Sequence, residues 1–100
     1  MQYLVIFSSN PKFKTDGMPS DFQQRELEDE AQVQVLYMEG GLRQAWALDT
    51  KDHGAVVLFE AESPEHVQKM IDSFPLIKAD YSNPQILPLA PYPAFAKKSV

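Results

Sequence analysis

The chain has 100 residues, a formal net charge of −5 and no cysteine. A negatively charged protein repels phosphate backbones, so we expect no nucleic-acid partner. The lack of thiols excludes disulfides, a cysteine nucleophile and thiolate metal sites. The hydrophobic share of 44% is that of a globular protein, and no apolar run approaches the ~20 residues of a membrane helix.

The size fits one domain. We predict a single domain over residues 1–100, with a core at about 2–90 and a tail at 91–100 that docks on a partner subunit. The opening MQYLVIF lacks the features of a secretory signal, which favours a cytoplasmic location.

The chain opens with a predicted strand and a predicted loop. Residues 2–8, QYLVIFS, are apolar on both faces and rich in β-branched and aromatic side chains, as in a buried strand. Residues 9–18 hold the Pro, Gly, Asn and Asp of a surface loop. Such a loop is either a plain connector or a functional segment, and the sequence leaves both open.

A long helix is predicted next. Ser20 and Gln23 stand at the spacing of a capping box, and Gly40 or Gly41 supplies a left-handed stop. Helical spacing predicts a buried face made of Leu27, Ala31, Val35 and Met38. The acidic residues are predicted to form a solvated face: Glu26, Glu28, Asp29 and Glu30.

A hairpin follows. Residues 42–49, LRQAWALD, predict a strand, and the polar turn TKDHG joins it to a second strand at 55–60. Simple alternation places one set of side chains on one face: Leu42, Gln44, Trp46 and Leu48. The other face then carries Arg43, Ala45, Ala47 and Asp49.

A second helix and a fourth strand complete the pattern. Ser63 is a predicted N-cap, Pro64 suits the first helical position, and Pro75 forbids continuation. The predicted buried face holds Val67, Met70, Ile71 and Phe74. The fourth strand is expected within YSNPQILPL, residues 81–89.

The predicted order, βαββαβ, is that of the ferredoxin-like α+β fold with an antiparallel sheet. Right-handed crossovers put both helices on one face of that sheet. The other face stays open and apolar, so we expect a second copy of the chain to cover it, giving a homodimer or a higher homo-oligomer.

Three stretches resemble muconolactone isomerases of the dimeric α+β barrel superfamily: EGGLRQAW (39–46), VVLFEAESPEHVQKMIDSFPL (56–76) and QILPL (85–89). The resemblance implies that two subunits pack their open sheet faces into a dimeric α+β barrel. It also implies a small-molecule pocket and isomerisation of a carboxylate-bearing lactone, without metal or organic cofactor, in aromatic compound catabolism.

The chain departs from the family at two places. Ala47 stands where a second basic residue tends to follow the tryptophan, and the turn DTKDHG is longer and more polar. The same architecture also serves YCII-like binding or accessory modules and cofactor-free monooxygenases, so both functions stay open as alternatives.

Three residues are candidates for substrate binding. The guanidinium of Arg43 can hold a substrate carboxylate in a bidentate manner. It can also pair with Glu39 or Asp49, or simply be exposed at an edge strand. Trp46 can wall a pocket, or it can pack in a core or a dimer contact. Tyr3, on the first strand, is expected to wall the cavity as well.

Proton transfer next to a carbonyl needs a positioned acid or base. The candidates are Glu39, Tyr37, Asp49 and His53, with Tyr3 and Tyr81 as further possibilities. His53 lies in the predicted turn and His66 on the polar side of a helix, where a solvated histidine without a role is the simpler interpretation. No spacing predicts a metal site, and no glycine-rich phosphate loop is present.

Overall fold

The computed structural model describes residues 1–49 and 54–96 and confirms the predicted α+β class. In chain order the elements are β1 (Gln2–Ser9), α1 (Phe13–Asp16), α2 (Phe22–Glu39), β2 (Leu42–Leu48), β3 (Gly54–Glu60), α3 (Pro64–Asp72), α4 (Pro75–Lys78), β4 (Ser82–Pro88) and α5 (Pro93–Ala96). Within the described residues the four predicted strands and two main helices are all present, and three short helices are additional.

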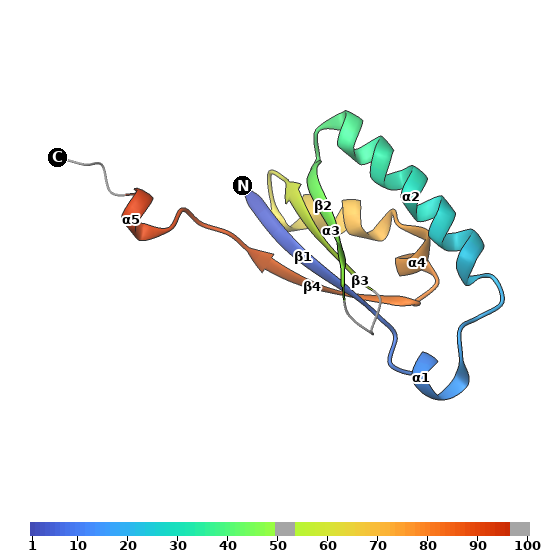
Figure 1. Ribbon diagram of the computed structural model, residues 1–100. Coiled ribbons are helices and arrows are strands. Elements are labelled where there is room, and N and C mark those ends of the chain that lie inside the picture. Colours follow the sequence, from blue (N-terminus) through green and yellow to red (C-terminus); the bar gives the residue numbers. More distant parts are fainter. Residues whose placement is uncertain (50–53, 97–100) are drawn as a thin grey trace.

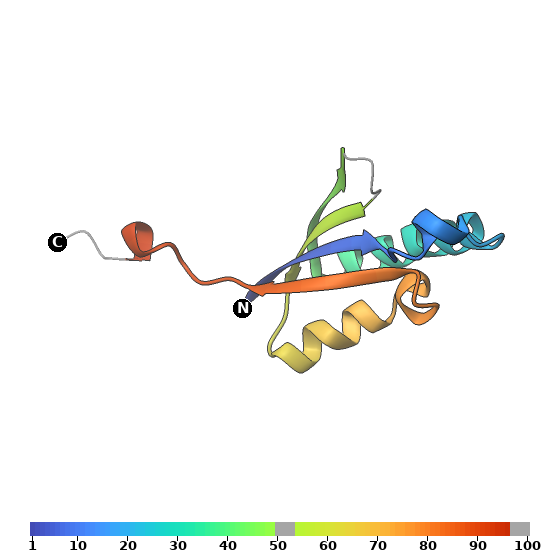
Figure 2. The ribbon, with the colours of Figure 1, turned by 90° about the horizontal axis from the view of Figure 1, so that it is seen from below.

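The sheet has the strand order β2-β3-β1-β4, and all neighbouring strands are antiparallel. Figures 1 and 2 show the two long helices, α2 and α3, on the same side of the twisted sheet. Because the helices cover one face only, burial alternates along β1. Tyr3 and Val5 are buried under the helices, whereas Leu4 and Ile6 point to the other face and stay partly exposed.

The second main helix, α3, forms as predicted. The Ser63 hydroxyl accepts a hydrogen bond of 3.1 Å from the backbone N–H of His66, and Pro64 occupies the first turn. The predicted face is buried against the sheet: Val67, Met70, Ile71 and Phe74. Pro75 ends this helix and opens the short α4.

The start of α2 differs from the prediction. The helix begins after Asp21, whose side chain makes no capping hydrogen bond, so the predicted capping box of Ser20 and Gln23 is wrong. The predicted stop is confirmed, because Gly40 adopts a left-handed φ of 89° and its N–H bonds to the carbonyl of Tyr37.

The predicted buried face of α2 is also wrong. Leu27, Val35 and Met38 are 60%, 47% and 82% exposed, and Ala31 is exposed as well. The helix instead meets the sheet through the adjacent stripe of Asp29, Gln32, Val33 and Leu36. The helix carries two partly apolar stripes, and periodicity alone does not say which one the sheet covers. Asp29 thus does not belong to the solvated acidic face, whereas Glu26, Glu28 and Glu30 are exposed as predicted; Glu26 and Glu30 also border the cleft described below.

Strand β2 departs from simple alternation at Arg43. Leu42 and Gln44 pair with consecutive residues of β3, so Arg43 is the extra residue of a β-bulge. Leu42 therefore lies on the helix-covered face, 2% exposed, whereas Trp46 pairs with Val56 on the open face. The prediction that Leu42 and Trp46 share a face is wrong, because the bulge shifts the alternation by one residue.

The predicted loop at 9–18 contains α1 and is tied to the end of β4. The Asn10 side chain donates a hydrogen bond of 2.9 Å to the carbonyl of Asp80. Phe13 packs edge-on against Tyr81 and Phe22, with ring centroids 5.5 Å and 6.3 Å away. The loop therefore packs against the side chains of Phe22 and Tyr81 through Phe13.

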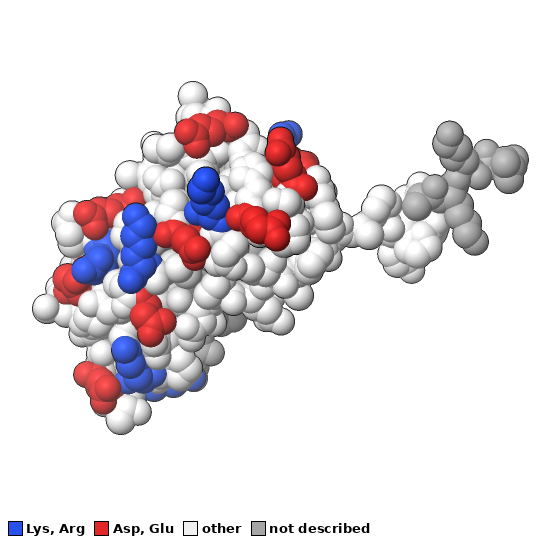
Figure 3. All heavy atoms as spheres, turned by 180° about the vertical axis from the view of Figure 1, so that it is seen from behind, with Lys and Arg blue, Asp and Glu red and all other residues white. Residues whose placement is uncertain are grey.

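The described residues after Leu89, 90–96, extend away from the rest of the protein (Figures 1 and 3). Its apolar side chains are uncovered: Tyr92 and Phe95 are 68% and 87% exposed. The radius of gyration of 15.3 Å exceeds the roughly 13 Å of a compact 100-residue domain. This segment therefore does not pack on its own sheet or helices.

Candidate functional site

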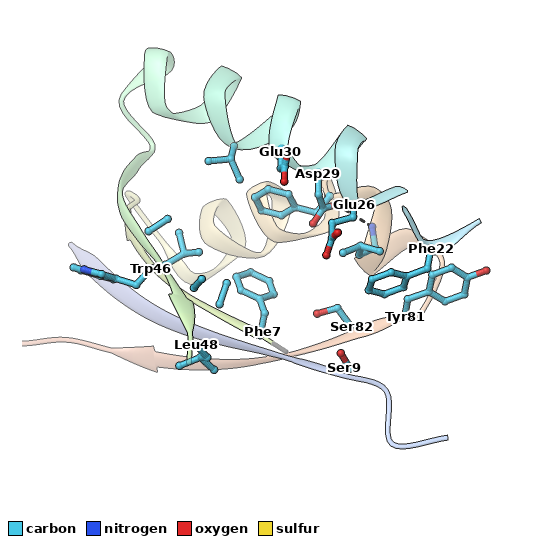
Figure 4. A pocket seen from close by; sticks show the side chains of 18 residues that line it. Phe7, Ser9, Phe22, Glu26, Asp29, Glu30, Trp46, Leu48, Tyr81 and Ser82 are labelled. Carbon is cyan, nitrogen blue, oxygen red and sulfur yellow. Dashed lines mark hydrogen bonds between the residues drawn. The ribbon is translucent and has the colours of Figure 1, made fainter. Parts of the chain in front are cut away.

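A cleft of about 440 Å³ lies between α2 and the helix-covered face of the β2–β3 hairpin (Figure 4). Strand β1 and the segments around α3, α4 and β4 close its other sides. Its volume is that of a site for a small ring compound.

The sheet wall of this cleft is made of small residues. Ala45, Ala47 and Ala55 all point toward α2, because the bulge at Arg43 sets their face and the register pairs Ala47 with Ala55. At Gly54 a Cβ atom would collide with the backbone carbonyl of Phe7, so only glycine fits there. Small side chains under a long helix leave the space that forms the cleft.

Aromatic side chains form other walls of the cleft. Phe7 and Phe74 meet edge to face, with ring centroids 5.8 Å apart. At the end near α1, Phe22 and Tyr81 lie stacked with centroids 6.3 Å apart (Figure 4). Such walls suit a flat apolar ring.

Asp29 is the half-buried carboxylate of the cleft. It projects from α2, and its Oδ1 accepts a hydrogen bond of 3.0 Å from the backbone N–H of Leu76 (Figure 4). Burial raises the pKa of Asp29 to about 6; the Leu76 amide opposes this shift, and the negative charges of Glu26 and Glu28 add to it. A carboxyl with this pKa can accept and return a proton near neutral pH.

The remaining polar groups of the cleft are acidic or neutral. Glu26 and Glu30 line it from α2, and Ser9 and Ser82 lie on the opposite side (Figure 4). Among the described residues that line it there is no lysine, arginine or histidine.

A charged cluster fixes Tyr81 at the end of the cleft. The Tyr81 hydroxyl donates a hydrogen bond of 2.8 Å to Asp21, and Arg25 donates one of 2.7 Å to the other oxygen of that carboxylate. These bonds lower the pKa of Asp21, and the bond to Asp21 raises the pKa of Tyr81. The guanidinium of Arg25 also lies 5.5 Å from the centre of the Tyr81 ring.

The predicted binding residues do not gather in this cleft. Trp46 borders it, but its ring turns away from the interior in Figure 4. Tyr3 is buried in the core, with its hydroxyl 3.5 Å from the sulfur of Met1. Arg43 is exposed at the bulge and lines neither described cleft. Their roles in binding stay predictions.

The predicted catalytic residues are also scattered. Glu39 lines a second cleft of about 340 Å³, beside Gly40 and His66, while Tyr37 and Asp49 are exposed. His53 lies outside the described residues. These side chains lie apart from one another and from the main cleft, so their catalytic roles stay predictions.

Sequence reasoning missed Asp29 as a site residue. The acidic run of residues 26–30 predicts a solvated face, although Asp29 stands four residues before Val33 and seven before Leu36, on the same side of a helix. Recognising that stripe as the buried one would have singled out its carboxylate.

The part of the chain that the structure describes meets the requirements of neither a metal site nor a membrane helix. No group of three or more His, Cys, Asp or Glu residues within 1–49 and 54–96 is placed to hold a metal ion. Within the same residues, no helix has the length and apolar character needed to cross a membrane.

The fold and the cleft define a ferredoxin-like α+β protein with a cavity of small-molecule size under its long helix. A family model described as muconolactone delta-isomerase matches residues 1–94. The chain therefore belongs to the muconolactone delta-isomerase family, which confirms the resemblance seen in the sequence.

Two solved structures share this fold. A crystal structure of muconolactone isomerase, at 20% identity, superposes with a TM-score of 0.75 and covers 99% of this chain and 98% of that chain. A 5-chloro-2-hydroxyhydroquinone dehydrochlorinase from Burkholderia phenoliruptrix AC1100, in complex with 2,5-dihydroxybenzoquinone, gives a TM-score of 0.66 at 17% identity, with coverage of 90% and 94%. No curated protein matches the sequence.

Proposed function

We propose that the protein is a cofactor-independent isomerase that shifts a proton within a small cyclic, oxygenated compound such as a lactone, in the catabolism of aromatic compounds. Membership of the muconolactone delta-isomerase family over residues 1–94 supports the reaction class. The observation that carries the proposal is Asp29, a half-buried carboxyl at a cleft of ring-compound size.

In this mechanism the Asp29 carboxylate removes a proton from the carbon next to the substrate carbonyl. The electron pair of the broken C–H bond enters the conjugated system as an enolate. Asp29 then returns the proton to the far carbon of that system, so the double bond moves and no atom is gained or lost. A carbonyl already acidifies the neighbouring C–H bond, and the chemistry therefore needs no metal or organic cofactor.

The surroundings of Asp29 favour this role. The Leu76 amide holds one carboxylate oxygen in place, which leaves the second oxygen for a proton. The aromatic walls, including Phe7 and Phe74, limit the water around the reacting carbons. The pKa of about 6 makes both protonation states accessible at neutral pH.

Proton exchange in deuterated water tests the proposal. Wild-type protein incubated with a panel of unsaturated lactones is expected to incorporate deuterium next to the carbonyl, measured by NMR. Asp29→Asn is expected to lower the rate by about 10²-fold or more, and Glu65→Gln, a charge change at an exposed position of α3, is the matched control. Lack of enzyme-dependent exchange with every lactone would contradict the isomerase assignment.

We also propose that a second copy of the chain covers the open sheet face. That face presents Leu4, Ile6, Trp46, Val56, Leu58 and Leu87. An apolar area of this kind, with a half-exposed tryptophan, is typical of a subunit contact. The single domain would then be the core at 2–90, with the tail at 91–100 resting on the partner, since the described tail residues find no cover on their own chain.

A further inference from the structure

We infer that the stacked rings of Phe22 and Tyr81 determine the substrate specificity of the cleft, because they set its length at one end. Ring compounds with a short substituent at that end are accepted, and those with a long one are excluded. Asp21 and Arg25 are positioning residues that hold the Tyr81 ring in place. This inference rests on the proposed function, since it takes the cleft to be the substrate site.

The two rings stand at one end of the cleft. Figure 4 shows Phe22 and Tyr81 together there, and Trp46 borders the cleft far from them. The two ring planes are inclined by 25°, with centroids 6.3 Å apart. The Tyr81 hydroxyl points away from the interior in Figure 4, so the pair presents ring carbons to a ligand. An apolar substituent that points to this end therefore meets an aromatic wall.

Helix α2 fixes the distance between this wall and the proposed base. Phe22 is the first residue of the helix and Asp29 follows seven residues later, about two turns on, so both side chains project from the same side. At about 1.5 Å per residue, their Cα atoms are separated by roughly 10 Å along the helix axis. This span has to hold the reacting ring, so it leaves room for few further carbon atoms.

The backbone of Tyr81 is tied to the proposed base through Leu76. The Tyr81 N–H donates a hydrogen bond of 2.9 Å to the Leu76 carbonyl, and the Leu76 N–H donates the bond of 3.0 Å to Asp29. The Asp80 N–H bonds to the carbonyl of Ile77 at 3.0 Å, and Asp80 has a left-handed φ of 62°. These bonds form a Schellman motif at the end of α4, which fixes where Tyr81 begins.

The side chain of Tyr81 is held at its hydroxyl and at its ring. The hydroxyl donates a hydrogen bond of 2.8 Å to Asp21, whose other oxygen accepts one of 2.7 Å from Arg25. The Arg25 guanidinium lies 5.5 Å from the ring centre, and Phe13 meets the ring edge-on with centroids 5.5 Å apart. A long ligand can push this ring aside only by breaking these contacts, so the wall resists displacement.

Two γ-butenolides, one with a methyl and one with a pentyl substituent, test the inference. Calorimetry on the full chain gives a preference ratio, defined as the affinity for the pentyl compound divided by that for the methyl compound. Phe22→Ala and Tyr81→Ala are each expected to raise this ratio by about tenfold or more, because the freed space can bury the added methylene groups. An unchanged ratio in both variants would overturn the inference.

A matched control and a milder variant accompany this test. Leu27→Ala removes apolar atoms from α2 at a position that is 60% exposed, and it is expected to change the ratio by less than about twofold. Phe22→Leu keeps most of the apolar volume and is measured in case the alanine variants do not fold. It is expected to raise the ratio by about threefold, and no rise would contradict the role of the wall.

A double-mutant cycle tests the positioning role. Asp21 makes no capping hydrogen bond, so Asp21→Ala leaves the start of α2 intact while it removes the acceptor of the Tyr81 hydroxyl. We expect it to raise the preference ratio by about threefold or more in the wild type, and by less than about twofold in the Tyr81→Ala variant. A merely structural role would weaken both ligands alike. Equal effects of Asp21→Ala in the two backgrounds would overturn the positioning role.

These measurements separate the inference from the isomerase proposal. A changed ratio without deuterium exchange would remove the reaction and keep the residues that set the length of the cleft. Exchange with an unchanged ratio would support the reaction and overturn the inference. Lack of binding of both butenolides to the wild type and to the cleft variants would overturn it as well.

Discussion

Asp29 shows how one helical position changes the chemistry of a carboxylate. Its sequence neighbours Glu28 and Glu30 are exposed, yet Asp29 faces the sheet and bonds to the Leu76 amide. A rotation of 100° per residue along the helix separates a solvated acid from a partly dry one. Partial burial raises the pKa of Asp29, which favours proton transfer near neutral pH. The same burial of a charged carboxylate lowers the stability of the folded chain.

The raised pKa of Asp29 has a consequence for stability. Below about pH 4 the group is protonated in both the folded and unfolded chain and has no effect. Between about pH 4 and 6 only the folded chain keeps the proton, so stability falls as pH rises, and above about 6 the full cost remains. Asp29→Asn is therefore expected to stabilise the protein by about 1 kcal/mol at pH 8, after allowance for solvent screening.

Urea unfolding at several pH values measures this gain. The difference between Asp29→Asn and wild type should vanish near pH 4 and be complete by pH 7. Glu65→Gln, at an exposed position of α3, should show no such dependence. A variant that is inactive and also less stable at pH 8 would indicate that Asp29 mainly holds the fold together.

Arg43 offers a second test at the scale of one residue. Its side chain is exposed and lines no described cleft of the protomer, so Arg43→Ala is expected to change ligand affinity by less than about twofold. Calorimetry with a neutral and a carboxylate-bearing lactone measures it. A loss of roughly tenfold confined to the carboxylate-bearing lactone would favour the anchoring role predicted from the sequence.

At the scale of the element, the sequence predicts a helix end correctly where a single residue type satisfies the backbone groups or the conformation at that end. Ser63 caps α3 through its own hydroxyl, and Gly40 ends α2 in a conformation that other residues avoid. The bulge at Arg43 has no such signal, although it decides that the alanines of β2 face the cleft. A β-bulge depends on how two strands pair, and a single strand does not reveal it.

The two predicted helix caps give opposite expectations. Ser63→Ala should lower the free energy of unfolding by about 1 kcal/mol, because the N–H of His66 loses its acceptor. Ser20→Ala should change it by less than about 0.5 kcal/mol, since Ser20 does not cap α2. Chemical denaturation of both variants measures this contrast, and equal losses would mean that Ser20 has a capping role after all.

At the scale of the whole molecule, the main feature is that several apolar surfaces of the described chain are exposed to solvent. The open sheet face, the stripe of Leu27, Val35 and Met38 on α2, and the tail with Tyr92 and Phe95 all fit this description. Two helices can cover only one face of a four-stranded sheet. We therefore expect the other face to be covered by association with a second copy of the chain.

A charge on the open sheet face should disrupt that association. Val56→Lys places an ammonium opposite Trp46, and we expect it to convert a dimer into monomers in sedimentation velocity experiments, because desolvating the charge opposes the contact. Leu27→Asp, on the exposed stripe of α2, is the control and should leave the dimer intact. A wild-type chain that sediments as a monomer at high concentration would contradict the proposed assembly.

The sequence by itself determined the order of the main elements, the α3 face and the family, because these depend on local propensity, capping and residue periodicity. It did not determine which stripe of α2 is buried, where β2 bulges or which acid enters the cleft. Those features depend on how α2 lies across the hairpin, since a helix with two similar stripes is oriented only by the surface that it packs against. The tertiary structure therefore selected Asp29, and with it the candidate site.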